Sequence, residues 1–292
     1  MLTFDHDETL AEARARNVRD ALMEDIGRGD WTGQLVPGGE RLRARVIVRE
    51  AAVLCGRDWF DAVFATLDPD ACVDWQADEG ARIEAGSEVC HVEAEARALL
   101  AGERPALNFL QLLSATATQT RAHVDAVAGA SPNPRGCAIL DTRKTLPGLR
   151  LAQKYAVRTG GGANQRLALY AGILIKENHI AAAGGVGAAL RNAHAQGAGV
   201  DIQIEVETLA QLREALAAGA TSILLDNFTL GEMREAVTET GGRALLETSG
   251  GVALEQVRAI AATGVDRISI GRLTKDVRAI DFSMRVIGSA PS

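Results

Sequence analysis

The chain has 292 residues, 47% of them hydrophobic, and a formal net charge of -7 at pH 7. That length suffices for one large core or two domains, and the acidic balance argues against general nucleic-acid binding, which needs a basic surface. We find no apolar run close to the roughly 18 residues that span a bilayer, and the first residues are acidic where a signal peptide is basic. We therefore expect a cytoplasmic protein that contacts neither membrane nor nucleic acid.

The first part of the chain mixes two kinds of pattern. Residues 8–24 have the spacing of an amphipathic helix and 59–67 are also expected to be helical, whereas 42–49 and 88–93 alternate apolar and polar residues as half-buried antiparallel strands do. These patterns predict an α+β sandwich domain over residues 1–115.

A carrier function is an alternative for this part, because glycines 80 and 86 are spaced with Ile83 and Val89 much as in domains that carry biotin or lipoate. Such a carrier needs a lysine to modify. The lysines of the chain are at positions 144, 154, 176 and 275, all outside this part, so we reject a carrier. The four cysteines, at 55, 72, 90 and 137, form no Cys-x-x-Cys pair, and we expect free, buried thiols.

A long helix is predicted over residues 103–128, with Pro105 in its first turn, where a missing N–H costs nothing. Beyond it, short apolar runs alternate with alanine-rich helices, which predicts parallel strands joined by helical crossovers. We expect a second domain over residues 116–275 and a tail, 276–292, that packs back on the first. The predicted strands of the second domain are residues 137–141, 172–176, 201–205, 221–226, 243–247 and 265–270.

Polar residues or glycine stand at the end of every one of these strands or directly after it. In a β/α barrel the carboxyl ends of all strands meet at one face, where such barrels place their active sites. A doubly wound open sheet also carries functional groups at these ends, so it stays open as an alternative, although the succession favours a barrel. Six strands are fewer than eight, which predicts an incomplete (β/α) barrel, and the fold class is α/β.

The basic run from Asp141 to Arg166 is the clearest candidate for binding anions. Arg143 and Arg166 can each hold a carboxylate or phosphate with two parallel N–H bonds, whereas Lys144 and Lys154 act as mobile point charges. A solvated basic helix face is the alternative, and Lys154, one turn from Arg158, could be supporting charge only.

The other strand ends suggest chemistry of their own. Lys176 could form a Schiff base, contact an anion, or pair with Glu177 or a neighbouring strand end. Glu205 and Asp226 could share a magnesium ion, bind sugar hydroxyls, or cap the helices that follow them. His179 could be a general acid, but a structural role is favoured. The run Ser249-Gly-Gly and Gly271 let backbone N–H groups approach a phosphate.

Taken together, several motifs resemble the quinolinate phosphoribosyltransferase family, also called nicotinate-nucleotide pyrophosphorylase (carboxylating). They cover nearly the whole chain: Glu103-Arg-Pro-Ala-Leu-Asn-Phe, Asp141-Thr-Arg-Lys-Thr-Leu-Pro-Gly-Leu-Arg, Leu174-Ile-Lys-Glu-Asn-His, Glu205-Val-Glu, Leu224-Leu-Asp-Asn-Phe and Ser249-Gly-Gly-Val. The resemblance implies transfer of a phosphoribosyl group from phosphoribosyl pyrophosphate to quinolinate with decarboxylation, giving nicotinate mononucleotide for NAD synthesis. It also implies a homodimer with shared active sites, leaves a higher oligomer open, and implies Mg²⁺ but no organic cofactor.

The resemblance further implies a role for each site residue. Lys144, Lys176, Glu205 and Asp226 would be catalytic, and the last two would hold magnesium directly or through water. The residues implied for quinolinate are Thr142, Arg143, Gln165, Arg166 and Lys176, joined by Arg104 of the partner subunit. The residues implied for phosphoribosyl pyrophosphate are Lys144, Glu205, Asp226, Ser249, Gly250, Gly251, Ile270, Gly271 and Arg272.

Two positions depart from the family pattern. Many members have His where Gln165 stands and Asp where Ala171 stands, and glutamine can donate a hydrogen bond but adds no charge. Two other interpretations of the barrel remain: an aldolase that uses Lys176 covalently, and a sensor that binds a phosphorylated metabolite without turnover. A molybdenum-transport paralogue of the same fold would lack the run Lys-Glu-Asn-His, which this chain keeps at 176–179.

Overall fold

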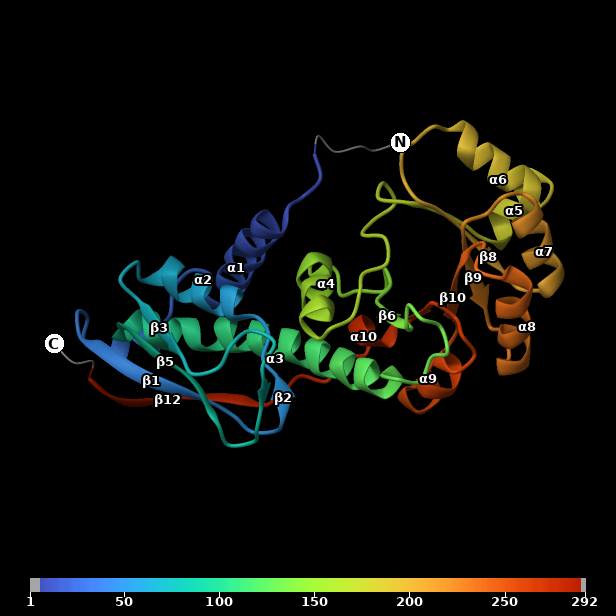
Figure 1. Ribbon diagram of the computed structural model, residues 1–292. Coiled ribbons are helices and arrows are strands. Elements are labelled where there is room, and N and C mark those ends of the chain that lie inside the picture. The colour runs from blue at the N-terminus through green and yellow to red at the C-terminus, as the bar shows by residue number, and fades with distance from the viewer. Residues whose placement is uncertain (1–5, 290–292) are drawn as a thin grey trace. The chain divides into compact units, whose positions relative to one another are not determined.

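A computed structural model describes residues 6–289 of the chain (Figure 1). The chain divides into two compact units. Unit 1 contains the described residues up to Gln119, the segment Leu146–Gly160 and the described residues from Asp276 onward, and unit 2 contains Thr120–Thr145 and Gly161–Lys275. The segment 146–160, predicted to belong to the second domain, therefore groups with unit 1.

Unit 1 is built from helices and an antiparallel sheet. Its elements before the long helix are α1 (Leu10–Ile26), η1 (Gly33–Leu35), β1 (Arg41–Val48), β2 (Ala52–Val53), α2 (Arg57–Leu67), β3 (Cys72–Trp75), β4 (Arg82–Ile83) and β5 (Glu88–Glu95). The long helix α3 (Ala96–Val127) follows, with residues 96–119 in unit 1 and the rest in unit 2, and the carboxyl-terminal strand β12 (Phe282–Ser289) returns to pair with β1. The strand order of the sheet is β12-β1-β5-β3.

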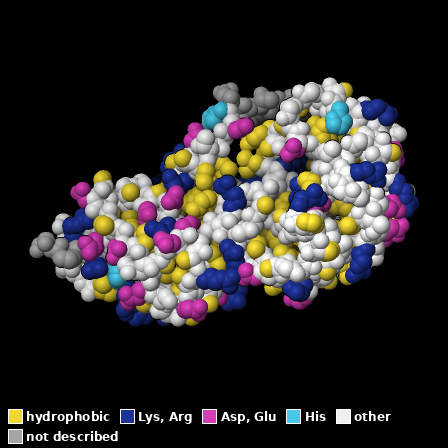
Figure 2. Space-filling view, viewed as in Figure 1, with side chains coloured by type: hydrophobic (Ala, Val, Ile, Leu, Met, Phe, Trp, Pro, Cys, Tyr) yellow, Lys and Arg dark blue, Asp and Glu magenta, His cyan; other side chains and the backbone are white. Residues whose placement is uncertain are grey.

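The alternation seen in the sequence sets the two faces of this sheet. Ala44, Val46 and Val48 of β1 are fully buried, whereas Arg43, Arg45 and Ile47, which alternate with them, are partly exposed. The core of the unit forms where this face meets the aromatic side chains of α2 and the apolar face of α3. Acidic and basic side chains are intermingled on the surface in view (Figure 2). All four cysteines are free, as predicted, but only Cys55 and Cys90 are buried, whereas Cys72 is exposed.

The long helix α3 begins earlier than predicted. The carboxylate of Glu95 accepts hydrogen bonds from the backbone N–H groups of Arg97 (2.9 Å) and Ala98 (3.1 Å), so it satisfies donors of the first turn and fixes the helix start there. Pro105 consequently lies inside the helix. The prediction of Pro105 in the first turn is wrong, because the capping carboxylate of Glu95 outweighs the preference of proline for a helix start.

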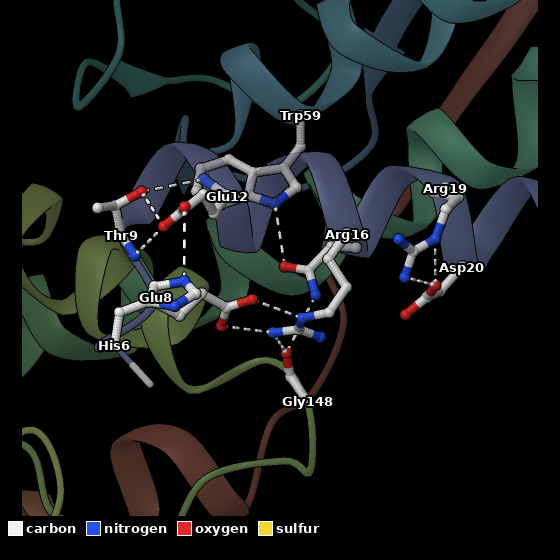
Figure 3. Close-up of polar contacts among 10 residues, drawn as sticks. His6, Glu8, Thr9, Glu12, Arg16, Arg19, Asp20, Trp59 and Gly148 are labelled. Atoms are coloured by element: carbon white, nitrogen blue, oxygen red, sulfur yellow. Dashed lines mark hydrogen bonds and ion pairs between the residues drawn. The ribbon is translucent and has the colours of Figure 1, made fainter. Parts of the chain in front are cut away.

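The segment 146–160 is held in unit 1 by α1 (Figure 3). The carbonyl of Gly148 accepts hydrogen bonds from Asn17 Nδ2 (3.0 Å) and Arg16 Nη2 (3.2 Å), and Arg16 is itself bound by Glu8. The helix that follows, α4 (Arg150–Thr159), buries Lys154 to 3% exposure. Lys154 is therefore not part of a solvated basic face.

Unit 2 is built on a parallel sheet. Its strands are β6 (Ala138–Leu140), β7 (Ile173–Ile175), β8 (Ile202–Val206), β9 (Ser222–Asp226), β10 (Leu245–Ser249) and β11 (Arg267–Ser269). Their order is β6-β11-β10-β9-β8-β7, so five strands follow one another in chain order and the first lies beside the last, with an open seam between β6 and β7. This is the order of a barrel opened at one seam, as predicted, because a doubly wound sheet would reverse direction in the middle.

Helices cover the outer side of this parallel sheet. They are α5 (Glu177–Ala183), α6 (Val186–Ala195), α7 (Leu209–Ala217), α8 (Leu230–Thr240) and α9 (Leu254–Ala261), whereas the short α10 (Arg272–Lys275) lies at the carboxyl ends of the strands, directly after β11. Figure 1 shows α6, α7 and α8 beside the strands β8–β10. Within residues 6–289 none of the helices could cross a membrane.

A buried carboxyl in unit 1 makes stability depend on pH. Asp61 of α2 accepts a hydrogen bond from Trp75 Nε1 at 2.9 Å, and burial raises the pKa of Asp61 to about 6. This pKa lies above that of Asp61 in the unfolded chain, so protonation of Asp61 stabilises the folded state. That stabilisation is fully present at low pH and is lost as pH rises through about 6.

We expect Asp61→Asn, which cannot ionise but can still accept from Trp75, to raise the free energy of unfolding by about 1 kcal/mol at neutral pH. At acidic pH the same substitution should change little. Denaturant titrations of both proteins across this pH range check the prediction, with Asp25→Asn on the exposed face of α1 as the control. Parallel pH profiles for the Asp61 variant and the parent would contradict it.

Candidate active site

A pocket of about 740 Å³ opens at the carboxyl ends of the unit 2 strands. It brings together every residue predicted to take part in binding or catalysis except Arg104, which belongs to unit 1. The predicted residues that line it are Thr142, Arg143, Lys144, Gln165, Arg166, Lys176, Glu205, Asp226, Ser249, Gly250, Gly251, Ile270, Gly271 and Arg272.

One side of the pocket is fixed by Asp141, a fully buried residue just after β6. Its carboxylate accepts hydrogen bonds from Asn164 Nδ2 (2.6 Å) and from the backbone N–H of Gln165 (2.9 Å). Ala163 also forms a bridge to Leu140 of β6. The segment after α4 is thus tied to the first strand at the open seam, and Arg166 is carried into the pocket.

Two arginines form a positively charged corner here. Arg166 Nη1 donates to the carbonyl of Gly172 at 2.7 Å, which orients its guanidinium. Burial lowers the pKa of Arg166, and the charge of Arg143 lowers it further. The two guanidinium groups therefore repel one another in a partly dry site, and an anion with two acidic groups would relieve that repulsion.

The loop of Lys144 is held against the turn after β11. Thr142 Oγ1 accepts from the backbone N–H of Lys144 (3.0 Å), and Thr274 Oγ1 donates to the Lys144 carbonyl (2.8 Å). A Cβ on Gly271 would lie 3.0 Å from Lys144 Cδ, so glycine at this position leaves space for the lysine side chain. The basic group is thereby placed beside backbone amides that could receive a phosphate.

Lys176 forms an ion pair across neighbouring strands. Its Nζ lies 3.1 Å from Glu205 Oε2, with the Glu205 side chain nearly buried and the Lys176 side chain 45% exposed. Burial raises the pKa of Glu205, Lys176 lowers it, and the charges of Asp226 and Glu177 raise it again. Of the three possibilities for Lys176, the structure shows pairing with a neighbouring strand end. His179 Nδ1 accepts from the backbone N–H of Lys176 at 3.0 Å, which favours its structural role.

The carboxylates suit a magnesium ion that is brought by a phosphorylated ligand. Asp226 Oδ2 accepts from Asn227 Nδ2 at 2.9 Å, and the Asp226 carboxylate is near enough to Glu205 to raise its pKa. Within the described part of the chain, no three His, Cys, Asp or Glu side chains cluster to hold a metal. Magnesium commonly uses one or two carboxylates together with phosphate oxygens and water, and this pair fits that pattern.

The turn after β10 has a backbone conformation that requires glycine. Gly250 has φ +119°, and a Cβ there would overlap Asn227 Oδ1. Asn227 itself has φ 56° and donates its backbone N–H to the Ser249 carbonyl at 3.1 Å. Asn227 also lines the pocket, although the sequence motif that contains it predicted no role for it.

Glu247 is another pocket residue without a predicted role. The sequence predicts a strand end at this position, but β10 runs on to Ser249, so Glu247 is fully buried inside the barrel. Its carboxylate accepts hydrogen bonds from Gln203 Nε2 (3.0 Å) and from Gln165 Nε2 (3.1 and 3.2 Å). The remaining pocket residues, all without predicted roles, are Leu174, Leu224, Val252, Ser269 and Lys275.

Comparison with known proteins agrees with this geometry. Residues 30–114 match the family model of the quinolinate phosphoribosyl transferase N-terminal domain. Residues 116–285 match the family model of the quinolinate phosphoribosyl transferase C-terminal domain. The nicotinate-nucleotide pyrophosphorylase [carboxylating] of Mycobacterium leprae is 42% identical, over 94% of this chain and 97% of its own. A probable nicotinate-nucleotide pyrophosphorylase [carboxylating] of Bacillus subtilis is 41% identical, over 91% of this chain and 90% of its own.

A solved structure is also similar over the whole length. The nicotinate-nucleotide pyrophosphorylase of Francisella tularensis superimposes with a TM-score of 0.90 at 39% identity, covering 98% of this chain and 100% of that one. Similarity of this extent includes both units and the strand ends that form the pocket. The chain therefore belongs to the quinolinate phosphoribosyl transferase family.

Proposed function

We propose that the protein transfers the phosphoribosyl group of phosphoribosyl pyrophosphate to quinolinate and releases pyrophosphate and carbon dioxide. The observation that carries this proposal is the pairing, in one pocket, of two mutually repelling arginines with carboxylates on neighbouring strand ends. Such a pocket holds a dianion on one side and a magnesium-bound phosphate on the other. The product is nicotinate mononucleotide, and we place the enzyme in de novo NAD synthesis in the cytoplasm.

Quinolinate is assigned to the corner formed by Arg143 and Arg166. Its two adjacent carboxylates match the forked geometry of guanidinium groups, and a partly dry site strengthens those charge-assisted bonds. Lys176 and Thr142 complete the charge and hydrogen bonding of the corner. Lys176 forms an ion pair with Glu205 in the absence of substrate. Binding of a dianion would draw the Lys176 ammonium toward the substrate and release the Glu205 carboxylate.

Phosphoribosyl pyrophosphate is assigned to the opposite wall. Lys144 and the turns at Ser249–Gly251 and Ile270–Arg272 offer a cation and backbone amides to its phosphates. Glu205 and Asp226 fit a magnesium ion carried by the pyrophosphate, and that ion would neutralise charge on the leaving group. The same carboxylates favour the positive charge that develops on the ribose as its bond to pyrophosphate breaks.

The chemistry needs little from the protein beyond placement. The ring nitrogen of quinolinate forms a bond to the ribose carbon as the bond to pyrophosphate breaks. The adjacent carboxylate then leaves as carbon dioxide, because the positive ring nitrogen stabilises the electron pair left on the ring carbon, which takes up a proton from solvent. Holding two anions together against their repulsion is the main contribution of the site.

We expect the purified protein with quinolinate, phosphoribosyl pyrophosphate and magnesium to form nicotinate mononucleotide and carbon dioxide in equal amounts. Chromatography of the nucleotide and trapping of the gas measure both. Nicotinate should not replace quinolinate, because it lacks the second carboxylate that the two arginines share. Saturable binding without pyrophosphate release would instead support a sensor, and trapping of a carbonyl substrate on Lys176 by borohydride would support an aldolase.

Gly250→Ala should impair the pyrophosphate side selectively. The new Cβ would need an unfavourable φ and would overlap Asn227, so we expect the KM for phosphoribosyl pyrophosphate to rise by about tenfold or more. The KM for quinolinate should stay within about twofold. Gly242→Ala is the matched control, since Gly242 has φ +77° but lies outside the pocket, and a Cβ there would meet no heavy atom within 4 Å. Equal changes in both KM values would contradict the assignment.

We also propose a homodimer in which Arg104 of the partner subunit reaches the quinolinate corner. The family resemblance supports this, and Arg104 is 56% exposed with Glu103 as a neighbour at 3.9 Å. Arg104→Ala and Lys144→Ala variants should each be nearly inactive. Mixing them after dissociation should restore up to about a quarter of the parent activity, because a hybrid dimer has one intact site. No recovery, with hybrid dimers verified by mass spectrometry, would rule out a shared site.

A further inference from the structure

We infer that Glu247 is a positioning residue for quinolinate binding, which acts through Gln165 on the backbone of Arg166. The inference rests on the proposed function and changes one part of it. Gln165, assigned by family resemblance to direct contact with quinolinate, would instead set the position of the arginine beside it.

The side chain of Gln165 is bonded at both ends inside the barrel. Its Nε2 lies 2.7 Å from Gln203 Oε1 and 3.1 Å from Glu247 Oε1, so both of its N–H bonds have acceptors. Its Oε1 accepts the backbone N–H of Arg166 at 2.6 Å. Both ends of this side chain are therefore bonded to the protein, and the contact that leads toward the pocket arginines passes through the backbone of Arg166.

Glu247 fixes the orientation of the Gln165 side-chain amide, that is, which of its nitrogen and oxygen faces Arg166. A carboxylate can only accept hydrogen bonds, so it selects the nitrogen of Gln165 and turns the oxygen toward the Arg166 N–H. Gln203 supports this arrangement because it accepts from Gln165 and donates to Glu247. A neutral amide in place of Glu247 could present either oxygen or nitrogen, and the orientation of Gln165 would no longer be determined.

The network is anchored away from the substrate. Arg267 Nε lies 3.8 Å from Glu247 Oε2, and Arg267 Nη2 donates to Ser222 Oγ at 2.9 Å. A second cavity of about 420 Å³, lined by Gln165, Gln203 and Arg267 among others, lies on the amino-terminal side of this layer. A polar layer that borders cavities on two sides is not held by apolar packing alone, so its hydrogen bonds have to fix its geometry.

The test is a double-mutant cycle of Glu247→Gln and Gln165→Ala with quinolinate and phosphoribosyl pyrophosphate varied separately. Each single substitution should raise the KM for quinolinate by about tenfold and leave the KM for phosphoribosyl pyrophosphate within about twofold. The double variant should be no worse than Gln165→Ala alone, because Glu247 has no effect once its intermediary is gone.

Thr240→Val is the matched control, because Thr240 is a polar residue of α8 that is equally buried but lies outside the pocket, and it should leave both KM values unchanged. If Glu247→Gln does not fold, Gln203→Met tests the same network, with an expected rise of about threefold in the KM for quinolinate only. Additive effects in the cycle, a parallel rise in both KM values, or an unchanged KM for quinolinate would each overturn the inference. A parent protein that forms no nicotinate mononucleotide would instead overturn the proposed function.

Discussion

The site depends on one buried carboxylate at the open seam of the barrel. A closed barrel would hold its first and second strands together by backbone hydrogen bonds, but here the two strands are apart. Asp141 takes over part of that task by binding Asn164 and the backbone of Gln165. An incomplete barrel can therefore present Arg166 as firmly as a strand end would, beside the seam where we propose that the acidic groups of quinolinate bind.

Charge distribution explains why the rest of the pocket is arranged around this seam. Arginines lie near β6, the first strand of unit 2, and carboxylates lie at the ends of β8 and β9. Lys176, at the end of β7, lies between the arginines and the carboxylates. A site that holds two anionic substrates needs cations for both, and negative groups beside those cations offset their mutual repulsion before the substrates bind. The raised pKa of Glu205 and the lowered pKa of Arg166 both reflect the desolvation that such packing requires.

Much of this could be predicted from the sequence, because parallel strands deliver their carboxyl ends to one face. The short apolar runs predict closely which residues form the strands of unit 2, and polar residues that follow these strands lie in the pocket. What could not be predicted depends on strand length and on contacts distant in sequence. The apolar run before Glu247 predicts a strand end there, whereas pairing with β9 extends β10 to Ser249. The start of α3 could not be predicted from Pro105, because a charged residue, Glu95, acts as the cap.

The path of the chain through the two units constrains how the protein can be built and can change. Between β6 and β7 the chain leaves unit 2, forms α4 within unit 1, and returns. Neither unit is a continuous stretch of sequence, so gene fusion or recombination cannot exchange one without breaking the other. The loop that carries Arg143 precedes α4 of unit 1, and the loop that carries Arg166 follows it. A substitution in the core around α4 can therefore also change the distance between the two arginines.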